Sequence, residues 1–158
     1  MGELFLNDCW TMYFHDPNDD NWEKHGYIKI SDIGTIQDFW KIADSVGDNW
    51  GKGMFFLMRE HIFPRWDEDM NKHGGAISVK ILTTDVTDYW IRTCCKVLGE
   101  TIVKGEHLAD NWDIVNGMSI SPKKNFCIIK LWLRSTELTE PSSFDLDPSP
   151  GDMIFKPY

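Results

Sequence analysis

The sequence lacks the features that would place it in or across a membrane. It has no run of about 18 consecutive apolar residues, the length that a transmembrane helix requires. Its first residues, Met1-Gly2-Glu3-Leu4, are not a basic region followed by an apolar stretch, which is the pattern of a secretory signal. We therefore expect a soluble, cytoplasmic protein without membrane contact, and we expect it to be a monomer.

Cysteine is scarce and is not spaced for metal binding. The four cysteines are Cys9, Cys94, Cys95 and Cys127, and no two of them form a Cys-x-x-Cys pair. Zinc sites and the disulfide frameworks of small secreted domains both depend on characteristic cysteine spacings. We expect reduced thiols in the protein core.

Basic side chains are also in deficit. The chain has 16 Lys and Arg residues against 25 Asp and Glu residues, which gives a formal net charge of −9. A protein with this charge repels a polyanion as a whole. If it binds nucleic acid, it must do so at a local site.

Motifs of common enzyme classes are missing. The chain has no Gly-x-Ser-x-Gly elbow, no phosphate-binding Walker loop, no His-Glu-x-x-His and no dinucleotide fingerprint. The acidic run Asp67-Glu68-Asp69 could hold Mg²⁺ in principle, but no second acidic cluster or histidine offers an evident base, and such runs are commonly solvated turns. We expect no enzymatic activity, no metal and no cofactor.

Tryptophan, by contrast, is abundant, with eight residues in a chain of 158. Four of them follow strand or helix periodicity and are expected to pack in the core: Trp10, Trp90, Trp112 and Trp132. Three lie in polar segments, where core packing explains them less well: Trp22, Trp50 and Trp66. An indole exposed on a loop is a stacking surface for a nucleobase or a cation.

Local patterns predict an α+β fold. Strands are expected over residues 10–15, 27–30, 54–58, 76–82, 112–120 and 126–133, with a turn at 121–125 between the last two. Thr35 and Asp38 are spaced as a capping box, which predicts a helix that ends at Gly47. A second helix is expected over 85–98. Neighbouring strands of this kind favour an antiparallel sheet of about six to eight strands with two or three helices on one face.

Five motifs, taken in order, resemble the eukaryotic translation initiation factor 4E family. They are Trp10 with Trp22, Thr35-Ile36-Gln37-Asp38-Phe39-Trp40, the segment from Pro64-x-Trp66-Asp67 to Asn71-Lys72-x-Gly74-Gly75, Tyr89-Trp90 to Leu98-Gly99-Glu100, and Leu131-Trp132. The resemblance spans roughly residues 6–133. It implies a curved antiparallel sheet, helices on the convex face and a concave face that binds the 7-methylguanosine cap of messenger RNA. Residues 1–134 would form this cap-binding domain, and the Ser-, Thr-, Pro- and Asp-rich tail 135–158 would be part of it.

The resemblance also implies how the cap would be held. Trp22 and Trp66 match the two tryptophans that stack on either side of the methylated base, whose positive charge adds a cation–π term of about 0.5–2 kcal/mol for each indole face. Asp67 matches a glutamate that accepts hydrogen bonds from guanine N1–H and N2–H, with a side chain shorter by one methylene.

The cap triphosphate requires cations, and the resemblance assigns this role to Lys123 and Lys124 in the terminal hairpin. Two arginines of the family are missing, since Ser121 or Pro122 and Ala76 stand at their positions. The phosphate contacts are therefore expected to be weaker, or to be made by Lys80, Lys104 or Lys156.

A second site is implied on the opposite face. There the family binds a helical Tyr-x-x-x-x-Leu-Φ peptide, where Φ is apolar, from the scaffold factor 4G or a competing 4E-binding protein. The matching positions are Ile36, Trp40, Ile91 and Cys95, with Arg92 where the family has an acidic residue. Arg92 is expected to repel a basic residue of the peptide.

Two functions remain open from the sequence. The first is recognition of capped messenger RNA in translation initiation or its control. The alternative is an interaction protein that has kept the fold, has lost cap binding and sequesters translation factors through the Trp40 face. The tail does not predict the third long helix of the family, which leaves contacts to the nucleotide after the cap open.

Overall fold

The computed structural model describes residues 2–158. The strands are β1 (Phe5–His15), β2 (Ile28–Thr35), β3 (Met54–Arg59), β4 (Gly75–Leu82), β5 (Val115–Pro122), β6 (Phe126–Leu133) and β7 (Ile154–Pro157). The α-helices are α1 (Ile36–Val46), α2 (Val86–Leu98) and α3 (Gly105–Asn111). Short 3₁₀ turns are η1 (Lys24–Gly26), η2 (Trp50–Lys52) and η3 (Pro141–Ser143).

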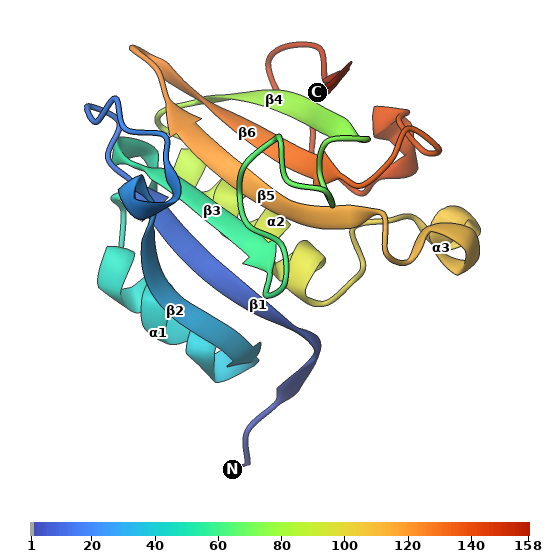
Figure 1. Ribbon diagram of the computed structural model, residues 1–158, viewed down its shortest axis with the longest axis horizontal. Helices are drawn as coiled ribbons and strands as arrows, with labels where there is room; N and C mark the ends of the chain where they lie inside the picture. The colour runs from blue at the N-terminus through green and yellow to red at the C-terminus, as the bar shows by residue number, and fades with distance from the viewer. Residues whose placement is uncertain (1) are drawn as a thin grey trace.

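All seven strands form one antiparallel sheet in the order β2-β1-β3-β5-β6-β4-β7. Figure 1 shows a curved sheet with α1 and α2 on one face, while the long loop between β3 and β4 lies in front of the other face. The predicted α+β class, with helices on one face of an antiparallel sheet, is confirmed.

Helix α1 begins as the sequence predicts. The Thr35 hydroxyl accepts a hydrogen bond from the Asp38 backbone N–H at 3.1 Å, and the Asp38 carboxylate accepts one from the Thr35 N–H at 3.1 Å. This reciprocal pair satisfies donors that the first turn of a helix leaves free. The helix ends before Gly47, whose φ of 60° favours glycine.

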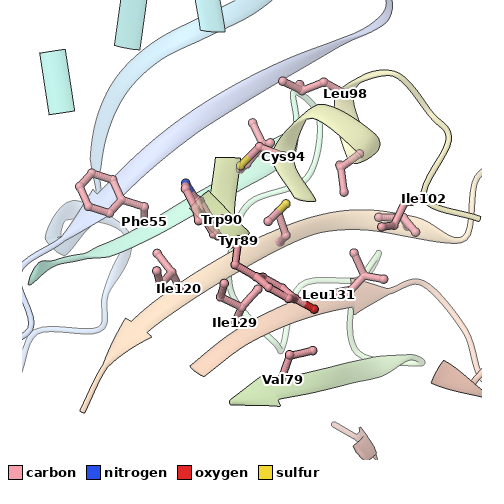
Figure 2. Close-up of a cluster of buried hydrophobic side chains, with 14 of the residues drawn as sticks. Phe55, Val79, Tyr89, Trp90, Cys94, Leu98, Ile102, Ile120, Ile129 and Leu131 are labelled. Carbon is pink, nitrogen blue, oxygen red and sulfur yellow. The ribbon is translucent and has the colours of Figure 1, made fainter. Parts of the chain in front are cut away.

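The main core lies between the sheet and helices α1 and α2. Trp10, Trp50 and Trp90 are completely buried in it, and the rings of Trp50 and Trp90 lie 5.7 Å apart. Figure 2 shows Trp90 of α2 directed towards the strands among aliphatic side chains such as Ile120 and Ile129. The interpretation of Trp50 as a loop tryptophan available for stacking was wrong, because η2 directs it into this core.

Two further elements were not expected. The segment after α2 contains the short helix α3 and reaches β5 only at Val115, so Trp112 is not in a strand and is 61% exposed. The tail adds β7, which pairs with β4. Between β6 and β7 the longest helical segment is the turn η3, as the composition of the tail predicted.

The irregular part of the tail is attached to α2. The Tyr89 hydroxyl donates to the Asp147 carbonyl at 2.7 Å, and the Lys96 ammonium contacts the Asp147 carboxylate at 3.1 Å. Burial raises the pKa of Tyr89 to about 12, so this phenol stays protonated as a donor.

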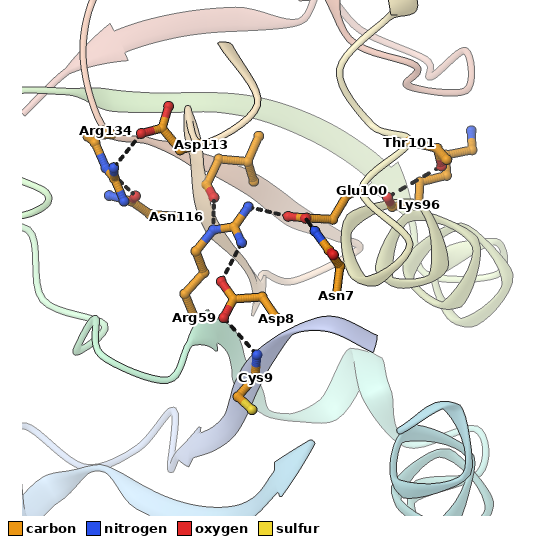
Figure 3. A network of polar contacts seen from close by, with 11 residues as sticks. Asn7, Asp8, Cys9, Arg59, Lys96, Glu100, Thr101, Asp113, Asn116 and Arg134 are labelled. Atoms are coloured by element: carbon orange, nitrogen blue, oxygen red, sulfur yellow. Dashed lines mark hydrogen bonds and ion pairs between the residues drawn. The ribbon is translucent and has the colours of Figure 1, made fainter. Parts of the chain in front are cut away.

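A buried arginine joins four elements at the opposite end of the sheet from the β5–β6 turn. The Arg59 guanidinium is paired with Asp8 at 2.7 Å and Glu100 at 2.6 Å, and it donates to the Val115 carbonyl at 2.8 Å (Figure 3). Its charge also lies 4.5 Å from the Trp10 ring. All its principal donors are thereby directed to acceptors, which is the condition for burying this charge.

The loop from residue 60 to 74 connects two strands that are not neighbours. β5 and β6 lie between β3 and β4 in the sheet, so the loop passes over them on the face that lacks the helices (Figure 1). At its end, Gly74 approaches the Leu133 carbonyl of β6 so closely that a Cβ atom would collide with it. This contact accounts for glycine at the end of the loop.

The expectation of four core cysteines was only half right. Cys94 and Cys127 are buried, whereas Cys9 and Cys95 are exposed, and all four are free thiols. Within residues 2–158, no helix combines the length and the apolar character needed to span a bilayer.

Candidate ligand-binding site

A cavity of about 430 Å³ opens on the sheet face opposite α1 and α2. Half of its lining residues are aromatic, and they come from the two long loops, the strands beneath them and the C-terminal residue. The residues are Trp22, Tyr27, Met54, Phe56, Pro64, Arg65, Trp66, Ser119, Ser121, Lys130, Trp132 and Tyr158. The cavity has the size and composition of a small-molecule site.

Trp22 lies at the end of the polar loop that follows β1 and is 45% exposed. One face of its indole stacks on the His15 imidazole, with ring centroids 3.8 Å apart and planes 5° from parallel. Tyr27 contacts it edge-on at 6.0 Å. The indole is thus supported from behind while the residue lines the cavity.

Trp66 is the more exposed of the two loop tryptophans, at 62%. Its loop is nevertheless tightly held, because the buried Asn71 amide donates to the carbonyls of Phe63 at 3.0 Å and Arg65 at 2.8 Å. Asn116 of β5 donates in turn to the Asn71 amide oxygen at 2.9 Å. A rigid loop therefore presents a free aromatic ring.

The floor of the cavity is formed by strand residues. The Trp132 indole N–H donates to the Ser119 hydroxyl at 3.0 Å, and Tyr158 lies against the Trp132 ring at 5.4 Å. Trp132 is 7% exposed, so its predicted burial is confirmed, but it faces the cavity rather than the helices. Burial raises the pKa of the Tyr158 phenol, which stays neutral.

An ion pair links the two loops that carry the tryptophans. Lys24 of η1 lies 3.3 Å from the Glu68 carboxylate, two residues beyond Trp66. The Lys24 ammonium also lies 5.2 Å from the centre of the Phe63 ring. These contacts bring the Trp22 and Trp66 segments together although they are far apart in the sequence.

Asp67 follows Trp66 in the loop but is not among the residues that line the cavity. One of its carboxylate oxygens pairs with the Arg65 guanidinium at 3.2 Å, and Arg65 does line the cavity. The structure therefore places a competing cation beside the predicted base-reading carboxylate.

A second cation, Lys130, lines the cavity beside Arg65, and the sequence analysis missed it. Burial lowers its pKa, and the nearby charges of Lys123 and Lys156 lower it further. Lys123 and Lys156 thus lie close enough to Lys130 to affect its pKa, although neither of them, nor Lys124, Lys80 or Lys104, is among the residues that line the cavity. Strand alternation was the available signal, since Lys130 lies two residues before Trp132 and shares its face.

The predicted partner-binding residues lie on α1 and α2, the two helices on the helical side of the sheet. Trp40 of α1 is 42% exposed, Ile36 and Ile91 are half-buried and Cys95 is exposed. Arg92 is paired with Asp88 at 3.0 Å and reaches Asp147 at 4.0 Å. Its charge is therefore partly compensated, which the sequence alone did not reveal.

Comparisons with known proteins show the family of the chain. The family model described as "Eukaryotic initiation factor 4E" matches residues 5–143. Translation initiation factor 4E of Saccharomyces cerevisiae is 25% identical over 139 residues, covering 84% of this chain and 62% of the relative. The human factor 4E is 23% identical over 143 residues, covering 85% and 63%. The chain thus spans less than two thirds of the length of these curated relatives.

Solved structures share the fold. Ascaris suum eIF4E-3, in complex with m7G cap, superposes with a TM-score of 0.71 at 19% identity, covering 86% of this chain and 76% of that one. Caenorhabditis elegans eIF4E-3, in complex with the 4E-binding protein Mextli and a cap analog, superposes with a TM-score of 0.70 at 23% identity, covering 85% and 76%.

Proposed function

Because the chain belongs to the eukaryotic initiation factor 4E family, we propose that it binds the 7-methylguanosine cap of messenger RNA and acts in translation initiation or its control. The observation that carries this proposal is the pair of exposed tryptophans, Trp22 and Trp66, at one aromatic cavity. The structural neighbours from Ascaris suum and Caenorhabditis elegans, solved with m7G cap and a cap analog, support it.

The methylated base would stack between these two indoles. His15 covers one face of Trp22, so the base would use the remaining face. Methylation at N7 gives the base a positive charge, and each indole face attracts it by about 0.5–2 kcal/mol beyond ordinary stacking. Unmethylated guanine lacks this term, so the site would discriminate by charge.

The edge of the base would be read by Asp67. The Arg65 contact occupies one of its carboxylate oxygens, which leaves the other to accept from guanine N1–H or N2–H. Base recognition would therefore rest more heavily on the stack than on hydrogen bonds to the carboxylate.

The triphosphate would be held by a basic group made of Lys130, Lys123 and Lys156. Burial, and after it the charges of Lys123 and Lys156, lower the pKa of Lys130, and a bound polyanion would offset this repulsion. Lys124 would contribute only long-range attraction. This local group explains how a protein with a net charge of −9 can bind an anionic ligand.

The helical face would bind a helical peptide around Trp40. Ile36, Ile91 and Cys95 would supply apolar contacts beside the half-exposed indole. A Schistosoma eIF4E solved with m7GpppA and a 4E-BP, and the neighbour bound to Mextli, support this use of the fold. Since Asp88 and Asp147 offset the charge of Arg92, repulsion of a basic peptide should be weaker than its sequence position implied.

Chromatography on a 7-methyl-GTP resin tests the cap-binding proposal. Wild-type protein is expected to be retained and to elute with free 7-methyl-GTP but not with GTP. The variant Trp22→Ala should flow through, whereas Trp112→Ala should be retained, because Trp112 is more exposed than Trp22 but lies outside the cavity. Flow-through of the wild-type protein would instead support the alternative, an interaction protein that has lost cap binding.

Calorimetry with a Tyr-x-x-x-x-Leu-Φ peptide tests the second site. The wild-type protein should bind the peptide and Trp40→Ala should not. Equal binding by both proteins would place the peptide elsewhere.

A further inference from the structure

His15 lies directly behind the stacking surface of Trp22. It is the last residue of β1 and is completely buried. Its ring is almost parallel to the Trp22 indole, at a centroid distance of 3.8 Å, and Tyr27 packs edge-on against it at 5.2 Å. The position of the indole plane is therefore set by the imidazole plane.

Both ring nitrogens of His15 contact the loop that leads to Trp22. Nδ1 lies 2.8 Å from the Asp16 carbonyl oxygen, and Nε2 lies 2.7 Å from the Asn21 carbonyl oxygen. Carbonyl oxygens only accept, so the ring donates to at least one of them in either neutral tautomer and to both as the imidazolium. One side chain thus fixes the first and last residues of the loop, and Trp22 follows directly.

The surrounding packing leaves this loop little alternative. The Asn21 carbonyl is so close to Gly26 that a Cβ atom there would collide with it. The Asn21 side chain meanwhile contacts the His25 ring at 2.6 Å. The loop end is held between His15 and η1.

We infer that His15 is a positioning residue for the ligand-binding tryptophan, which it holds in a parallel stack and fixes through the carbonyls of Asp16 and Asn21. The inference rests on the proposed function and adds a fourth ring to the stack, in the order His15, Trp22, base and Trp66. His15 does not touch the ligand. It acts by presenting Trp22 in its binding orientation before the ligand arrives, which lowers the entropic cost of binding.

The variant His15→Phe tests this role, because phenylalanine keeps an aromatic ring beneath Trp22 but cannot donate to either carbonyl. Binding of 7-methyl-GTP and GTP would be measured by tryptophan fluorescence. Affinity for 7-methyl-GTP should fall about fivefold for each hydrogen bond removed. GTP affinity should fall by the same factor, because positioning affects both ligands alike. Hydrogen exchange of the amides in residues 16–22 of the ligand-free protein should become faster.

Thr11→Val is the matched control. Thr11 is buried on the same face of β1 and donates one side-chain hydrogen bond, to Asp32 at 3.0 Å, away from the cavity. Its loss should change neither ligand affinity nor exchange in residues 16–22.

Three results would overturn the inference. They are unchanged affinity in His15→Phe, an equal loss of affinity in Thr11→Val, and a loss confined to 7-methyl-GTP, which would indicate an effect of charge rather than position. If the wild-type protein binds neither nucleotide, the proposed function fails. The exchange rates of residues 16–22 then still decide whether His15 orders the loop.

Discussion

Trp90 and Trp66 lie on opposite faces of one sheet and occupy contrasting environments. Trp90 is completely buried, like Trp10 and Trp50, and the indole N–H groups of all three have no hydrogen-bond partner within residues 2–158. An unpaired buried donor costs about 1–3 kcal/mol. Burying a tryptophan, which removes 150–250 Å² from water at about 25 cal/mol per Å², gains roughly 4–6 kcal/mol. On the helical face, the free energy gained by burying the ring exceeds the cost of leaving its N–H group unpaired.

On the cavity face the balance is reversed. Trp22 and Trp66 keep about half or more of their surface in water, although each belongs to a segment fixed by specific hydrogen bonds. Exposed aromatic rings on ordered loops do not add to folding stability in proportion to their area. The comparison teaches that tryptophan contributes to stability where the helices cover the sheet, and that under the proposed function it contributes to binding where they do not.

The largest expected effect comes from breaking the helical side of this comparison. Trp90→Ala should lower the free energy of unfolding by about 3–5 kcal/mol, because it leaves a large cavity among side chains that cannot collapse to fill it. Chemical denaturation monitored by circular dichroism would measure the change. A loss below 1 kcal/mol would contradict the structural role assigned to this ring.

Trp66→Ala is the counterpart on the cavity side. It should leave the free energy of unfolding within about 0.5 kcal/mol of the wild-type value, because little packing is lost. Binding of 7-methyl-GTP should weaken by about 1–3 kcal/mol through loss of stacking. Denaturation and calorimetry on the same preparation separate the two effects, and destabilisation comparable to that of Trp90→Ala would erase the contrast.

Lys130→Met sharpens the comparison by separating charge from stacking. Affinity for 7-methyl-GTP should fall by about 1 kcal/mol at low salt and by less at high salt, where phosphate attraction is screened. Because burial and neighbouring lysines lower the pKa of Lys130, its charged form disfavours folding at pH 7, and the variant should be as stable as the wild type or more stable. Lys124→Met serves as control and should show a smaller loss. An equal loss in both would argue against a special role for Lys130.

The smallest expected effect concerns Trp40, an exposed tryptophan on the helical face. The contribution of an indole to stability should depend on how far its ring is buried and not on which side of the sheet it lies. Trp40→Ala should therefore change the free energy of unfolding by less than about 1 kcal/mol. Thermal unfolding of Trp40→Ala, Trp90→Ala and the wild-type protein would measure the two changes side by side. A destabilisation similar to that of Trp90→Ala would mean that the face, not the exposure, determines the role.

Features set by local sequence were predicted well. The capping box of Thr35 and Asp38, the second helix and the terminal hairpin depend on residues close together in the chain, and each is present, although the first strand of the hairpin begins at Val115 rather than at residue 112. Trp22 and Trp66 were found through their polar surroundings and the family motifs. Both line the cavity.

Features set by distant contacts were not. Trp50 and Trp112 were assigned to the wrong environments, because η2 and α3 are too short to give a periodic signal and tertiary packing decides which ring is covered. The contacts of His15 and the pairing of Arg65 with Asp67 depend on loop geometry that composition does not encode. Lys130 could have been found by counting along the strand from Trp132, but its proximity to Lys156 required the pairing of β7 with β4.

The crossing of the 60–74 loop over β5 and β6 has a consequence for how the chain folds. β1, β2, β3 and α1 are contiguous in sequence and in space, so they can assemble early. β4 follows β3 in the chain but has no neighbour until β6 has formed, and the β5–β6 hairpin must insert between two strands that are already tethered. Such non-local pairing slows folding. The Trp66 loop would therefore close over the sheet in a late step, and ligand binding would appear only when that step is complete.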